Sequence, residues 1–122
     1  MMSSDIISLK VPSKPDYISL VRLATSGVVH NLKLSIDEIE DLKVCVAEAC
    51  VNVLNIGNVD EISIRYKVME DRIIIIVKDV LEDVSNKVDN PEEGKLGILI
   101  IKSLMDRVIF TPDGIEMIKY IE

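Results

Sequence analysis

The stretch KVCVAEACVNVLN, Lys43 to Asn55, is the one around which the rest of the chain is organised, because three polar residues interrupt an otherwise apolar segment at helical spacing. Glu48, Asn52 and Asn55 are separated by four and then three positions, so on an α-helix they share one side. The apolar residues between them can face a core. The sequence therefore predicts a buried helix with a carboxylate and two carboxamides along one stripe, and such a stripe needs partners.

The ends of this helix are also marked in the sequence. Ser35 followed by Glu38 forms a capping box, so we expect the helix to run from about Ile36 to about Asn55, with Gly57 as its C-terminal stop. We interpret Asn55 by itself as a polar residue at the helix end.

Length and composition limit the class of protein. The chain has 122 residues, of which 48% are hydrophobic and 29% charged, which predicts a single globular domain over residues 1–122. A formal net charge of −7 argues against direct nucleic-acid binding, because phosphates require clusters of Lys and Arg. Cys45 and Cys50 lie in the same predicted helix and are expected to be buried thiols of a reducing compartment. With no signal-peptide pattern and no apolar run near the ~20 residues that span a bilayer, we expect a cytoplasmic protein without membrane contact.

The elements before the central helix are a strand and a helix. Alternation over Ile6 to Val11, closed by Pro12, predicts a strand at a sheet edge. Apolar residues then repeat at helical spacing from Tyr17 to Leu32. Arg22 lies off this apolar stripe, and we leave open whether it is a solvated charge or a contact for a partner protein.

The remaining elements complete a sheet. Strands with alternating residues from Ile62 to Val68 and the apolar run IIIIV, Ile73 to Val77, predict an antiparallel hairpin whose second strand is central. Residues 80–95 lack periodicity, and a loop of this length suggests a functional lid. A third helix continues at helical spacing from Ile98 to Val108, and the turn TPDG joins a last hairpin, 108–110 with 115–121. The order predicts an α+β two-layer sandwich, a mostly antiparallel sheet with about three helices on one face.

Three separated segments resemble a known family, namely IEDLKVCVAEACVN at 39–52, VKD at 77–79 and GKLGILIIKSLMDRV at 94–108. Together with the KVP and KYI ends, they resemble the anti-sigma-factor serine-protein kinases of the histidine-kinase-like (GHKL, Bergerat-fold) ATPase superfamily. The segments follow the family's order over nearly the whole chain, which is more specific than one short motif.

The resemblance implies roles for individual residues. Glu48 matches the acidic residue of the family's N box and would act as general base on the hydroxyl of a substrate serine. Asn52 matches the N-box asparagine, whose amide oxygen would ligate the Mg²⁺ that bridges the ATP phosphates. Asp79 matches the aspartate that accepts a hydrogen bond from the adenine amino group.

Gly94 and Gly97 resemble the family's second glycine box at the exit of the lid, where small residues let backbone amides approach phosphate. Lys95 between them would add positive charge. Two positions depart from the family, because Leu81 stands where glycine is usual and Ile56 where histidine is common. The leucine is expected to narrow or fill the adenine pocket.

The resemblance further implies a function. The protein would be an anti-sigma factor, forming a homodimer, that binds an RNA-polymerase sigma factor and uses Mg-ATP to phosphorylate a serine of an anti-anti-sigma protein. A second interpretation is a catalytically weakened module of the same fold that sequesters its partner without kinase turnover. A third is a nucleotide-binding regulator of another signalling pathway.

Overall fold

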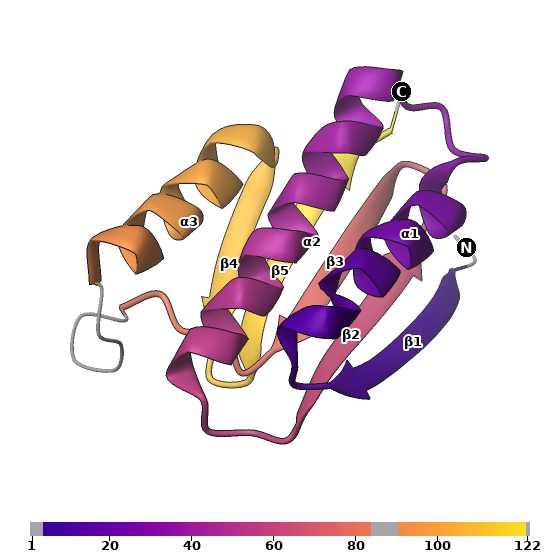
Figure 1. The fold of residues 1–122 in the computed structure, drawn as a ribbon. Helices are drawn as coiled ribbons and strands as arrows, with labels where there is room; N and C mark the ends of the chain where they lie inside the picture. Colours follow the sequence, from indigo (N-terminus) through magenta and orange to yellow (C-terminus); the bar gives the residue numbers. More distant parts are fainter. Residues whose placement is uncertain (1–3, 84–90, 122) are drawn as a thin grey trace.

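The α-helices of the protein lie on one face of a five-stranded antiparallel sheet (Figure 1). The computed structural model describes residues 4–83 and 91–121. The elements in chain order are β1 (Asp5–Pro12), the 3-10 turn η1 (Pro15–Tyr17), α1 (Ile18–Val29), α2 (Ile36–Ile56), β2 (Glu61–Val68), β3 (Arg72–Lys78), α3 (Pro91–Leu104), β4 (Arg107–Thr111) and β5 (Gly114–Tyr120). The strand order β1-β2-β3-β5-β4 places β3 in the middle and β1 at an edge. The α+β sandwich predicted from the sequence is confirmed.

Helix α2 crosses the middle of the sheet, with α1 and α3 packed on either side of it (Figure 1). The capping box is present, since the Ser35 hydroxyl accepts the Glu38 N–H at 3.1 Å and the Glu38 carboxylate accepts the Ser35 N–H at 3.0 Å. The helix ends at Gly57, whose φ of 68° is left-handed and whose N–H donates to the Val53 carbonyl. The predicted ends of the helix are therefore right to within one residue.

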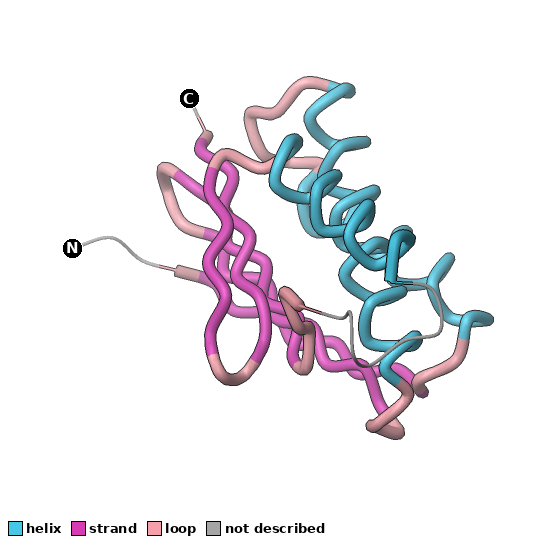
Figure 2. Tube along the Cα trace, turned by 90° about the vertical axis from the view of Figure 1, so that its left-hand side faces the viewer, coloured by secondary structure: helices cyan, strands magenta, loops and turns pink. Residues whose placement is uncertain are grey.

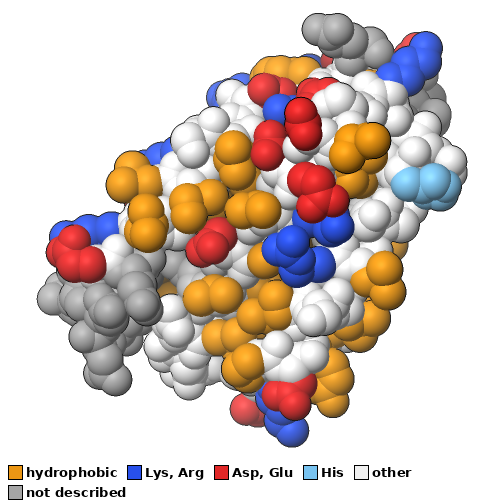
Figure 3. Space-filling view, turned by 45° about the horizontal axis from the view of Figure 1, so that its top comes forward, with side chains coloured by type: hydrophobic (Ala, Val, Ile, Leu, Met, Phe, Trp, Pro, Cys, Tyr) orange, Lys and Arg blue, Asp and Glu red, His pale blue; other side chains and the backbone are white. Residues whose placement is uncertain are grey.

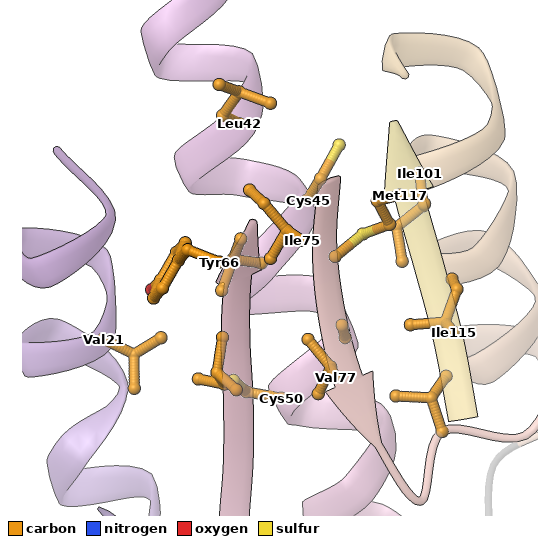
Figure 4. Packing of buried hydrophobic residues seen from close by; sticks show 14 of the residues in the cluster. Val21, Leu42, Cys45, Cys50, Tyr66, Ile75, Val77, Ile101, Ile115 and Met117 are labelled. Atoms are coloured by element: carbon orange, nitrogen blue, oxygen red, sulfur yellow. The ribbon is translucent and has the colours of Figure 1, made fainter. Parts of the chain in front are cut away.

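The core lies between the helices and the facing side of the sheet (Figure 4). Its one tyrosine, Tyr66, is fully buried, and its hydroxyl lies 2.7 Å from the Thr25 hydroxyl, so the polar atom has a partner. Cys45 and Cys50 are buried free thiols, as predicted. Burial raises the pKa of each thiol to about 12, and for Cys45 the charge of Asp41 adds to this effect. Both thiols are therefore neutral near pH 7.

The third helix differs from the sequence prediction. It begins at Pro91 rather than near Ile98, and Gly94 and Gly97 lie within it instead of in a loop. Glycine inside a helix costs about 1 kcal/mol relative to alanine, so two glycines argue against a helix in a sequence-based prediction. In the structure these glycines face α2 and permit close packing. The helix also ends earlier, so that Val108 belongs to β4. Of the predicted lid at 80–95, residues 84–90 lie outside the described residues and those from Pro91 belong to α3.

The other face of the sheet carries no helix in the described part of the chain (Figure 2). In β3 the alternate residues Ile73, Ile75 and Val77 are buried toward the helices, whereas Ile74 and Ile76 are only half-buried on the opposite face. Among the described helices, none is long and apolar enough to cross a membrane.

Candidate functional site

A small hollow between α2 and α3 brings together four residues predicted for the site. Glu48 and Asn52 line it from α2, and Gly94 and Gly97 line it from α3. Asn55 lines it too, although the sequence analysis interpreted this residue only as a helix-end polar group; its spacing on the Glu48–Asn52 stripe was the available signal. The hollow holds about 10 Å³, which is at the lower limit for a single water molecule, so α3 closes directly over the polar stripe.

The contact between Glu48 and Gly97 sets this close approach. A Cβ atom built on Gly97 would lie 2.8 Å from the Glu48 carboxylate oxygen Oε2, so only glycine fits without movement of that carboxylate. Glu48 is half-buried. Within residues 4–83 and 91–121 its carboxylate has no hydrogen bond and no ion pair. The carboxylate is therefore positioned by packing, and its oxygens have no hydrogen-bonding partner among the described residues.

Asn52 has a different environment on the same stripe. Its side chain is 6% exposed, and it forms two hydrogen bonds with the backbone of Leu81. Asn52 Nδ2 donates to the Leu81 carbonyl at 3.0 Å, and Asn52 Oδ1 accepts the Leu81 N–H at 3.1 Å. The pair ties the middle of α2 to the segment that leaves β3. This partner could not be predicted from the sequence, because the bonded groups of Leu81 are backbone atoms.

Asp79 directly follows β3 and is held by the β4–β5 turn. Its φ of 68° is uncommon for a residue other than glycine, and its N–H donates to the Asp113 carbonyl at 2.7 Å. The close approach requires Gly114, because a Cβ atom there would overlap the Val77 carbonyl. The turn therefore fixes the backbone of Asp79 at the end of the central strand.

A second hollow lies beside Asp79 and holds about 130 Å³. It is lined mainly by apolar side chains, and the full set is Val53, Ile56, Asn58, Val59, Asp79, Val80, Leu81 and Pro112. Leu81 thus forms part of the wall and leaves the hollow open. The space is below the range of about 300–1,000 Å³ for whole-ligand clefts, so it suits one ring system rather than a complete nucleotide. The Asn52–Leu81 pair connects the two hollows, since Asn52 lines the first and Leu81 the second.

Two predicted site residues lie apart from these hollows. Lys95 is exposed and its ammonium lies 4.0 Å from the Glu92 carboxylate. Arg22 is half-buried in a shallow hollow of about 260 Å³ that α1 and α2 line, together with Leu23, which is 70% exposed, and Lys43. In the view of Figure 3, acidic, basic and apolar side chains lie interspersed on the surface. Because Arg22 lines neither the hollow beside Glu48 nor the one beside Asp79, it belongs to a surface separate from both.

Comparison with known proteins agrees with this geometry. Residues 11–118 match the histidine kinase-like ATPase domain. The serine-protein kinase RsbW of Bacillus velezensis is 38% identical over 124 residues, which cover 87% of this chain and 78% of that protein. RsbW of Bacillus subtilis is 37% identical over the same shares, and RsbW of Staphylococcus aureus is 34% identical over 97% of this chain and 88% of that protein. The chain therefore belongs to the histidine kinase-like ATPases and, within them, to the serine-protein kinase family that its sequence resembles.

Proposed function

We propose that this protein is a cytoplasmic anti-sigma factor that binds a sigma factor and uses Mg-ATP to phosphorylate a serine of an anti-anti-sigma protein. One observation supports the proposal most strongly. The Glu48 carboxylate is held beside Asn52 and the two glycines of α3, without a partner of its own among the described residues, in a chain whose relatives are named serine-protein kinases.

The nucleotide is assigned to the two hollows. Asp79 would accept the hydrogen bond of the adenine amino group, with the ring against Ile56 and Leu81. The phosphates would lie toward Gly94 and Gly97. Lys95 would approach them only by leaving Glu92.

The side chain of Asn52 is suited to be a ligand of Mg²⁺. Its amide oxygen has two lone pairs, and the Leu81 N–H occupies one of them. Mg²⁺ prefers oxygen ligands and usually takes only one or two from the protein, with phosphates and water supplying the rest. When bound, the ion would neutralise the negative charge of the phosphates. Asn52 would hold the ion on the α2 side.

Glu48 would act on the substrate serine. Its carboxylate takes the proton of the serine hydroxyl while the serine oxygen bonds to the γ-phosphorus, the bond to the ADP oxygen breaks, and ADP leaves. A positioned general base contributes about 10²–10⁴-fold to such a rate. Because the hollow beside Glu48 holds about 10 Å³, α3 must move away from α2 before phosphates can reach this carboxylate.

The same closed contact favours a second candidate function. If α3 stays packed on Glu48, the protein is a binding module that sequesters a sigma factor without kinase turnover. In that case Arg22 and the exposed Leu23, on the α1 surface, would contact the sigma factor. The protein would bind it as a homodimer.

Phosphate transfer from radiolabelled Mg-ATP to the anti-anti-sigma protein separates the two functions. For the kinase we expect transfer, and we expect Glu48→Gln, which keeps the shape of the side chain, to lower its rate at least about 100-fold while nucleotide affinity stays within about threefold. Unchanged transfer by Glu48→Gln removes Glu48 as the base. If the protein does not bind nucleotide at millimolar ATP, the kinase function is disproved and the binding module remains.

A further inference from the structure

One lysine lies among the core residues on the helix-covered side of the sheet. Lys119 is 8% exposed, and among the Lys and Arg residues in the described parts of the chain it alone is buried. On β5 it alternates with Ile115 and Met117, which belong to the core, so its side chain lies on the same face of the sheet as theirs. Taking an ammonium group out of water is costly unless it has charged or hydrogen-bonding partners. The partners of Lys119 therefore show what this position is for.

The ammonium group of Lys119 meets acceptors from both α2 and the end of α3. Its Nζ donates to the Leu104 carbonyl at 3.5 Å, and it lies 3.7 Å from the Asp106 carboxylate and 3.9 Å from that of Glu38. Leu104 is the last residue of α3, where carbonyls lack partners inside the helix and the helix dipole favours a cation. Glu38 belongs to the capping box of α2. Lys119 therefore joins the first turn of α2 to the last turn of α3.

A second lysine holds the same end of α3 from the surface. The Lys102 ammonium lies 2.8 Å from the carboxylate of Glu82, in the segment that follows β3. It also lies 5.7 Å from the centre of the Phe110 ring in β4, within range of a cation–π contact. An exposed ion pair contributes little stability by itself. Together with Lys119, however, it gives the C-terminal end of α3 a second charged contact with the rest of the protein.

The N-terminal half of α3 is held differently. Helices α2 and α3 run in opposite directions (Figure 1), so the start of α3 lies beside the end of α2. Gly94 and Gly97 meet the polar stripe of α2 there without side chains of their own. The ion pair of this half, between Lys95 and Glu92 at 4.0 Å, lies within α3 itself. Helix α3 is therefore tied to its surroundings by charge at its C-terminal end and by packing at its N-terminal half.

We propose that Lys119 is a positioning residue that fixes the C-terminal end of α3, so that the nucleotide site opens by a swing of the N-terminal half of this helix. The proposal rests on the proposed function, in which α3 moves away from α2 to admit phosphates. Gly97 lies about two turns, or about 10 Å, from the held end at Leu104, so a small rotation about that end separates Gly97 from Glu48. The held end then guides α3 back to the same position. Lys119 thus acts on the site through α3 and touches neither nucleotide nor substrate.

Hydrogen exchange of the free protein, followed by NMR, tests the held end without any nucleotide. In the wild type we expect the amides of residues 95–99 to exchange at least about tenfold faster than those of residues 101–105. Lys119→Met keeps a long unbranched side chain but removes the charge. It should speed exchange at 101–105 at least about tenfold and at 95–99 less than about threefold.

The matched control is Tyr66→Phe. It removes a buried hydrogen bond with Thr25 of α1, away from α3, so it lowers stability without touching the held end. We expect it to change exchange in the two groups of amides by the same factor.

Phosphate transfer shows whether the held end matters for the site. Lys119→Met should lower kcat about tenfold while KM for Mg-ATP stays within about threefold, because α3 no longer returns to one position over Glu48. Lys119→Arg keeps the charge and should restore kcat to within about threefold of the wild type. A purely structural role would lower stability in Lys119→Met and Tyr66→Phe alike and leave kcat unchanged in both.

Three results would overturn the proposal. These are slower exchange at 95–99 than at 101–105 in the wild type, an equal response of the two groups of amides to Lys119→Met, and wild-type kcat in that variant. If the wild type transfers no phosphate, the proposed kinase function fails, whereas the exchange comparison still decides the role of Lys119.

A milder variant serves if circular dichroism shows that Lys119→Met does not fold. Asp106→Asn removes one counter-charge of Lys119 but keeps an oxygen that can accept the Tyr120 N–H. It should speed exchange at 101–105 at least about threefold and leave 95–99 unchanged, and equal changes in both groups would overturn the proposal.

Discussion

The two sides of the candidate site are built in different ways. Helix α2 has a capping box at one end, a left-handed glycine at the other and seven buried residues between them. The opposite side, α3 and the segment after β3, has two glycines, and its Leu96 and Leu99 are 58% and 62% exposed. It meets the polar stripe of α2 through the Gly97–Glu48 contact and the Asn52–Leu81 pair. The α2 side is thus fixed by its own sequence and core, and the proposed binding of a nucleotide between the two sides relies on movement of the other side.

The strongest test of the rigid side is alkaline pH. The thiols of Cys45 and Cys50 ordinarily ionise near pH 9.0, and burial raises each pKa to about 12 in the folded protein. Between these values the unfolded chain loses two protons that the folded chain keeps, so the free energy of unfolding is unaffected below pH 9 and falls above it. The slope is about 1.4 kcal/mol per pH unit for each thiol.

Urea denaturation between pH 8 and pH 10 measures this loss. The Cys45→Ala, Cys50→Ala double variant removes both titrating groups and should show a much flatter dependence. An equally steep fall in the double variant would mean that other groups carry the effect.

Asn52→Ala tests the link between the two sides. It leaves the Leu81 N–H and carbonyl without their partners in a part-buried place, so we expect a loss of about 1–3 kcal/mol in the free energy of unfolding. Asn55→Ala, on the same stripe but exposed, should change it by less than about 0.5 kcal/mol. Equal effects of the two substitutions in urea denaturation would show that the Leu81 bonds contribute little.

Gly97→Ala tests whether the position of the Glu48 carboxylate affects phosphate transfer more than it affects stability. The new methyl group displaces the flexible Glu48 carboxylate, while alanine favours the helix by about 1 kcal/mol, so the free energy of unfolding should change by less than about 1 kcal/mol. Phosphate transfer should fall about tenfold, because the base is moved. Gly27→Ala in α1, where a Cβ atom has open space, is the control and should leave transfer unchanged. Wild-type transfer by Gly97→Ala would contradict the assigned position of Glu48.

Leu81→Gly should have the smallest effect, on the hollow beside Asp79 that we propose for the adenine ring. Removing the leucine side chain widens the space of about 130 Å³ beside Asp79, so we expect the affinity for Mg-ATP, measured by calorimetry, to rise a few-fold. Leu81→Ala should give an intermediate value. Unchanged affinity across this series would show that Leu81 does not limit nucleotide binding.

Much of the fold was predictable because its signals are local. The capping box, the left-handed glycine and the alternation in the strands act between residues a few positions apart, so α2 and the hairpins were predicted closely. The same periodicity placed Glu48 and Asn52 on one stripe. The start of α3 was predicted wrongly, because its glycines are poor helix formers and the packing against α2 that favours them is long-range.

Residue patterns alone were enough to predict the helix that carries the polar stripe, the central strand that ends at Asp79 and the family. The contacts of those polar groups could be seen only once distant segments were packed together. Asn52 bonds to backbone atoms of Leu81, 29 positions away, and backbone groups leave no trace in a sequence. Residues of neighbouring strands that share a face of the sheet are likewise brought together only by strand pairing. Local interactions fix elements, whereas the contacts that make a site or a surface depend on how distant segments pack.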